Sequence, residues 1–131
     1  NGLYLRTTDL RNGRNLGRAF TNSSGNWRFR EIWAPAFEVP VVGTTGAGDC
    51  AVAGFLAAVL RGMSPENALS IAAAVGACNV EAADATSGVR SWSETLSRIN
   101  RDWKQHDLAL PGWKFNRTTH LWNSPIDGRP V

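Results

Sequence analysis

The fold is decided by residues 40–54, which read Pro-Val-Val-Gly-Thr-Thr-Gly-Ala-Gly-Asp-Cys-Ala-Val-Ala-Gly. An apolar run that ends at Val42 predicts a strand, residues 43–48 predict a glycine turn, and the apolar run 50–60 predicts a helix. Backbone N–H groups without partners point out of the first turn of a helix, and the helix dipole adds positive charge there. Glycines let an anion approach the backbone closely. Strand, glycine turn and helix together therefore predict an anion site that suits a phosphate.

Asp49 places a carboxylate inside this turn, where it would repel an anion unless it has a separate role. Such a role is to take a proton from a nucleophile that attacks the bound phosphate. The other interpretation is a carboxylate that only stabilises the start of a helix. The glycines before Asp49 favour the first interpretation, and they predict phosphoryl transfer.

Two other phosphate-binding motifs were compared with this turn. A nucleotide P-loop needs Gly-x4-Gly-Lys-Ser/Thr, and no lysine follows these glycines. Residues 46–51 match the looser dinucleotide pattern Gly-x-Gly-x-x-Ala, which also requires a strand after the helix. Here Ser64-Pro65-Glu66 predicts the start of a second helix instead. A dinucleotide-binding oxidoreductase is therefore the weaker alternative.

The remaining patterns predict an α/β fold. Alternating or apolar runs predict strands over 3–5, 27–33 and 37–39. A solvated loop is predicted over 9–26, which contains the turn pair Asn12-Gly13 and the arginines Arg11, Arg14 and Arg18. The helix over 50–60 is apolar on all sides, which predicts burial on all sides. Further helices are expected over 64–83 and, after the capping box Ser91 to Glu94, over 91–104. Residues 113–115 and 120–122 are expected to pair as a hairpin.

Composition limits the function classes. The 131 residues suffice for one domain. The chain has 14 basic and 11 acidic residues and a net charge of +3, and no basic run is interleaved with aromatic residues. This pattern argues against a nucleic-acid partner. Cys50 and Cys78 lie in apolar contexts and are expected to be reduced core residues. The longest apolar run is too short to cross a membrane and no leader opens the chain, so we expect a cytoplasmic protein without a membrane partner. His106 and His120 lack a spaced partner, which argues against a metal site.

The chain opens at Asn1-Gly2-Leu3 without a methionine, directly in an expected strand. We therefore expect it to be part of a longer protein.

At this point the string Thr44-Thr45-Gly46-Ala47-Gly48-Asp49 and the small-residue helix after it carry a resemblance. They resemble the C-terminal signature of the ribokinase-like carbohydrate kinases, the PfkB family. The similarity is centred on residues 30–105, with 106–131 as a tail. It implies that the chain is the C-terminal nucleotide-binding and catalytic portion of a three-layer α/β/α sandwich, and that an N-terminal part of the same protein supplies most of the sheet and nearly all sugar contacts.

The resemblance also implies roles for individual residues. Asp49 would be the catalytic base, and the backbone N–H groups of Gly46, Ala47 and Gly48 would form the anion hole. The substrates would be ATP and a sugar or nucleoside, with Mg²⁺ bridging nucleotide phosphates, and a homodimer would be compatible with the family. The residues implied in nucleotide binding are Thr44, Thr45, Ala73, Gly76 and Ala77.

One departure from the family concerns a monovalent cation. Several members bind K⁺ with an acidic residue six positions before the catalytic aspartate, where this chain has Gly43. The remaining candidate ligands are Thr45 and backbone carbonyls near Val80, Ala83 and Ala85. Gly43 argues against K⁺ dependence. Ala73 stands where some members have an asparagine near the adenine, so contacts to the base are expected to be apolar or made by the backbone.

Overall fold

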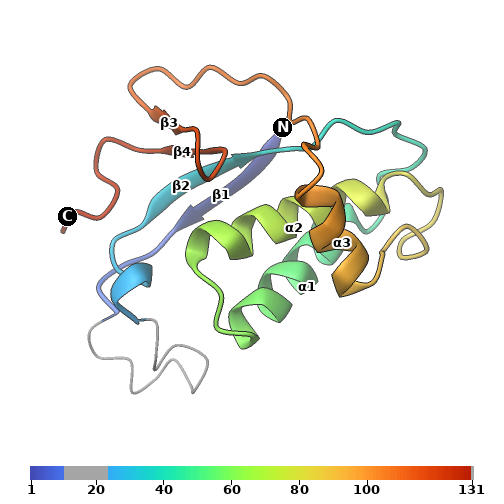
Figure 1. Cartoon of the computed structure of the whole chain (residues 1–131), viewed down its shortest axis with the longest axis horizontal. Helices are drawn as coiled ribbons and strands as arrows, with labels where there is room; N and C mark the ends of the chain where they lie inside the picture. Colours follow the sequence, from blue (N-terminus) through green and yellow to red (C-terminus); the bar gives the residue numbers. More distant parts are fainter. Residues whose placement is uncertain (11–23, 131) are drawn as a thin grey trace.

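The computed structural model describes residues 1–10 and 24–130, in which three α-helices lie on one side of a four-stranded antiparallel sheet (Figure 1). Along the chain the elements are β1 (Gly2–Arg6), the 3-10 helix η3 (Ser24–Trp27), β2 (Glu31–Pro35), α1 (Ala47–Leu60), α2 (Pro65–Asn79), α3 (Trp92–Ile99), β3 (Lys114–Asn116) and β4 (Leu121–Asn123). The expected loop over 9–26 is described only in part, and its turn at Asn12-Gly13 and its arginines Arg11, Arg14 and Arg18 lie outside the described residues. None of the described helices is long and apolar enough to span a bilayer.

The sheet has the strand order β1-β2-β4-β3. Tyr4 of β1 pairs with Trp33 of β2, and Phe115 of β3 pairs with Trp122 of β4. The expected first strand and the C-terminal hairpin are therefore confirmed. The strand expected from residue 27 begins only at Glu31, because Phe29 adopts a left-handed backbone with φ 54° that interrupts the extended chain.

The strand expected over 37–39 is wrong in the described structure, where this segment makes only one isolated bridge, from Phe37 to Gln105. Farther along, the N–H groups of Val42 and Gly43 both donate to the carbonyl of Val80, at 2.8 and 3.2 Å. The backbone here is thus bonded to the C-terminal end of α2 rather than to a neighbouring strand. This contact brings the chain beside α2 immediately before the glycine turn.

Helices α1 and α2 form the main helix pair. The caps of α2 are as predicted: the Ser64 hydroxyl accepts from the Asn67 N–H at 3.3 Å, and Pro65 occupies the first helical position. Gly54 allows the close approach, because a Cβ there would lie 2.9 Å from a Val75 methyl carbon. α2 ends at Asn79 and α3 at Ile99, both earlier than expected.

The expectation that the first helix is buried on all sides is wrong for the described structure. Val52, Leu56 and Leu60 are 59, 54 and 75% exposed. They recur at every fourth position and so lie on one face of α1, while Ala51 and Ala58 are buried on the opposite side. α1 therefore carries an apolar face that no described residue covers.

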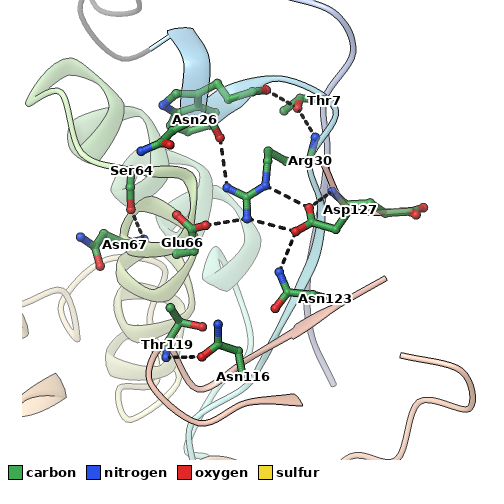
Figure 2. Close-up of polar contacts among 12 residues, drawn as sticks. Thr7, Asn26, Arg30, Ser64, Glu66, Asn67, Asn116, Thr119, Asn123 and Asp127 are labelled. Carbon is green, nitrogen blue, oxygen red and sulfur yellow. Dashed lines mark hydrogen bonds and ion pairs between the residues drawn. The ribbon is translucent and has the colours of Figure 1, made fainter. Parts of the chain in front are cut away.

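A partly buried polar cluster fastens the C-terminal residues to the sheet and to α2 (Figure 2). Arg30, just before β2, makes ion pairs with Asp127 at 3.0 Å and with Glu66 of α2 at 2.5 Å. The Asp127 carboxylate also accepts from the Glu31 N–H at 2.8 Å and from the Asn123 amide at 2.7 Å. Burial raises the pKa of Asp127, but these bonds, led by that from Arg30, outweigh it and hold the pKa below its ordinary value.

Candidate functional site

The glycine turn leads directly into α1, so Asp49 lies in the first turn of this helix rather than before it. Gly46 is the N-cap residue, with a left-handed φ of 73°. The Ala47 N–H donates to the Thr44 carbonyl at 3.3 Å. The N–H groups of Gly48 and Asp49 fall where a helix offers no acceptor of its own. The turn therefore presents backbone donors at the positive end of the α1 dipole.

Two glycines of the turn have different surroundings. A Cβ at Gly46 would lie 2.5 Å from the Ala85 carbonyl oxygen, so this position needs glycine both for its φ and for space. A Cβ at Gly48 would meet nothing within 4 Å. The fold thus requires Gly46, whereas Gly48 leaves open space next to the backbone.

Next to Asp49, which is exposed, Cys50 is buried and its thiol donates to the Ala85 carbonyl at 3.3 Å. Burial, and then the charge of Asp49, raise the pKa of this thiol. Cys50 is therefore a poor nucleophile at neutral pH.

A cavity of about 390 Å³ opens beside the turn. One wall comes from α2, another from residues 36–41 after β2, and a third from the start of β1. Most of its lining is apolar, as in small-molecule sites generally. The lining residues are Asn1, Gly2, Leu3, Ala36, Phe37, Val39, Val41, Thr44, Ala47, Gly48, Ala51, Ala72, Ala73, Gly76, Ala77, Val80 and His106.

The structure brings most of the expected nucleotide-binding residues to this cavity. Thr44, Ala73, Gly76 and Ala77 all line it, together with Ala47 and Gly48, which are expected to form part of the anion hole. Outside the lining lie Thr45, Gly46 and Asp49 of the turn, as well as Ala83 and Ala85 of the following loop. The glycine turn thus stands at the border of the cavity, with only part of it facing inward.

Asn79, the last residue of α2, is a functional candidate that the sequence analysis missed. Its side chain is fully buried, and its amide donates to the Thr45 carbonyl at 2.9 Å, while its Oδ1 atom has no partner in the described structure. A buried polar side chain of this kind holds the turn to the end of α2. The signal in the sequence is the asparagine that closes an otherwise small and apolar helical run.

Three of the four carbonyls expected around a monovalent cation have hydrogen-bond partners. Val80 accepts from the N–H groups of Val42 and Gly43, Thr45 accepts from Asn79, and Ala85 accepts from Cys50. A Cβ at Gly43 would lie 2.9 Å from the Ala83 carbonyl oxygen. The described residues also contain no group of three His, Cys, Asp or Glu side chains that could hold a metal ion. Any ion here would depend on backbone oxygens.

The loop after α2 is held by Asp84. Its carboxylate accepts from the N–H groups of Thr86 and Ser87 at 2.9 and 2.7 Å. The Ser87 side chain, followed by these two N–H groups, lowers the pKa of Asp84 to about 2. The carboxylate is therefore ionised at neutral pH and fixes the loop that carries Ala85 against the glycine turn.

Comparison with known proteins is consistent with this geometry. Residues 28–92 match the model of the pfkB family of carbohydrate kinases. The match includes β2, the glycine turn, α1 and α2, and it ends at the first residue of α3. Neither the comparison with curated proteins nor the comparison with solved structures found a match.

The match therefore places this part of the chain in the pfkB family, whose members are carbohydrate kinases. The resemblance inferred from the glycine turn is confirmed. A dinucleotide-binding oxidoreductase is excluded, because α1 is followed by the helix α2 and not by a strand.

Proposed function

We propose that the protein transfers the γ-phosphoryl group of ATP to a hydroxyl group of a sugar or nucleoside. The observation that carries this proposal is the exposed carboxylate of Asp49 in the first turn of α1, beside Gly48 and the apolar cavity. A hydroxyl group must lose its proton as it attacks phosphorus, and a carboxylate next to an anion site is suited to accept it.

In the proposed reaction the substrate oxygen forms a bond to the γ-phosphorus of ATP. The bond between the γ-phosphorus and the oxygen that bridges it to the β-phosphate breaks, and ADP leaves. Asp49 accepts the hydroxyl proton. Backbone N–H groups of Gly46, Ala47 and Gly48 stabilise the negative charge that develops on the phosphoryl oxygens. The Ala47 N–H would have to give up its bond to the Thr44 carbonyl to serve in this way, whereas Gly48 lies in the free first turn of α1.

The nucleotide is proposed to occupy the cavity, with α2 as one wall through Ala73, Gly76 and Ala77, and with Thr44 and Thr45 near the phosphates. The cavity volume of about 390 Å³ falls in the range of small-molecule sites. Mg²⁺ fits only as an ion carried by the nucleotide, because the described residues supply no cluster of carboxylates for it. It would supply charge neutralisation of the phosphates. Gly43 and the bonded carbonyls argue against K⁺.

We further propose that these residues are the C-terminal portion of a three-layer α/β/α sandwich in a cytoplasmic protein, and that the 131 residues alone are inactive. The support is the uncovered apolar face of α1 at Val52, Leu56 and Leu60. Such a face needs a cover, which the N-terminal part of the same protein, or a second copy in a homodimer, would supply.

The test is an assay of the complete protein for ADP release from ATP across a panel of sugars and nucleosides. ADP release that depends on one member of the panel supports the proposal. ATP binding without such release from any member would instead indicate a non-catalytic nucleotide-binding module with a regulatory or interaction role.

A further inference from the structure

A segment after the family match also reaches the cavity. Residues 103–106 lie beyond residues 28–92, which match the pfkB model, yet His106 is among the cavity-lining residues. From the sequence, His106 was considered only as a metal ligand, and its position in the structure suggests a different use.

Hydrogen bonds fix residues 103–106 along residues 35–38. The Glu38 N–H donates to the Lys104 carbonyl at 2.8 Å, and the His106 N–H donates to the Ala36 carbonyl at 2.9 Å. Side chains reinforce this pairing: the Gln105 amide donates to the Pro35 carbonyl at 2.9 Å, and the Trp103 indole donates to the Glu38 carbonyl at 3.0 Å. Since these bonds hold its backbone, His106 is positioned for binding.

The cavity has two chemically different ends. One wall is formed by a continuous stretch of chain. It begins at Ala36, whose carbonyl accepts from the His106 N–H, and ends at Thr44 in the glycine turn. The turn end offers backbone N–H groups at the start of α1, which suits phosphate. The opposite end combines apolar side chains with the imidazole of His106, which suits a planar, hydrogen-bonding group.

We infer that His106 contacts the base of the nucleotide and contributes to its selection. This inference rests on the proposed function, because it assigns the phosphates to the glycine turn. An imidazole can stack on a purine and can donate or accept a hydrogen bond at the base edge. Ala73 and Ala77 of α2 contribute only small apolar side chains to the lining, so His106 can supply a polar contact to the base.

The test uses the complete protein and its variants His106→Ala and His106→Gln with two probes, ADP and tripolyphosphate. Tripolyphosphate carries the phosphate chain without a base. We expect both variants to weaken ADP binding about five- to tenfold, as loss of one good polar contact does, and to leave tripolyphosphate binding unchanged. Because the His106 side chain is exposed, the variants are expected to fold, which circular dichroism verifies.

His120 is the matched control, since it is exposed and lies outside this cavity. In NMR spectra ADP should shift the imidazole signal of His106 and leave that of His120 unchanged. If ADP binds and neither the His106 signal nor the variants' affinity changes, this inference is overturned and the proposed function stands. If neither ADP nor tripolyphosphate binds to the complete protein, the proposed function fails and the inference fails with it.

Discussion

At the scale of single residues, the two glycines on either side of Ala47 separate folding from binding. Gly46→Ala is expected to destabilise the protein by about 1–3 kcal/mol, because an alanine there has a strained left-handed backbone and meets the Ala85 carbonyl. Gly48→Ala adds a methyl group in open space within a helix and should leave stability unchanged or slightly higher. The measurement is the free energy of unfolding in denaturant for both variants.

Phosphate binding, unlike stability, should be sensitive to Gly48→Ala. The added methyl group of Gly48→Ala occupies space beside the proposed anion hole, so tripolyphosphate affinity should fall at least tenfold in a folded protein. Unchanged affinity in Gly48→Ala would remove Gly48 from the proposed site.

Asn79 is expected to act as a positioning residue. Asn79→Ala leaves the Thr45 carbonyl without its buried donor, which should cost about 1–2 kcal/mol of stability. Because the glycine turn loses its hydrogen bond to α2, ADP binding to the complete protein should weaken. The NMR signal of the His106 imidazole should still shift when ADP is saturating. A variant with reduced stability and full ADP affinity would show that Asn79 serves folding alone.

At the scale of elements, the cluster around Arg30 links the C-terminal residues, β2 and α2. Asp127→Asn leaves the partly buried guanidinium with only one carboxylate partner, so we expect a loss of about 2–3 kcal/mol, less than the roughly 3–5 kcal/mol of fully buried pairs. Glu38→Gln is the matched control, since its pair with Lys104 is exposed and should contribute little to stability.

The same cluster has a predictable pH dependence. The pKa of Asp127 is lowered in the folded state, so the stability it contributes is complete above the ordinary value of 3.8 and is lost as the pH falls through the lowered pKa. The variant lacks this contribution. The difference in unfolding free energy between wild type and Asp127→Asn should therefore shrink between pH 7 and pH 2. A difference that stays constant would show that Asp127 stabilises through packing rather than charge.

At the scale of the whole molecule, the parts predictable from the sequence are those governed by local rules. The α2 cap at Ser64 and Pro65, the capping box at Ser91 and the hairpin of β3 and β4 depend on a few neighbouring residues, and the structure confirms them. The glycine turn was recognisable because its motif is short and specific.

Features that depend on partners distant in the sequence were not predictable. Residues 37–42 look like a strand, but the N–H groups of Glu38 and Val42 donate to the carbonyls of Lys104 and Val80 instead. The apolar run of α1 predicted burial, although one face has no cover among the described residues. His106 and Asn79 became candidates only when the fold brought them to the cavity and the glycine turn, because neither belongs to a motif.

The central claim concerns Asp49, and its most direct test is Asp49→Asn in the complete protein, with Asp102→Asn as an exposed control outside the site. The measurement is the rate of phosphoryl transfer from ATP to the preferred sugar or nucleoside, together with ATP affinity. Loss of a general base typically lowers the rate by about 10²–10⁴-fold. The account predicts a loss of that size in Asp49→Asn with ATP binding retained and with normal turnover in the control. Near-normal phosphorylation by Asp49→Asn would contradict it.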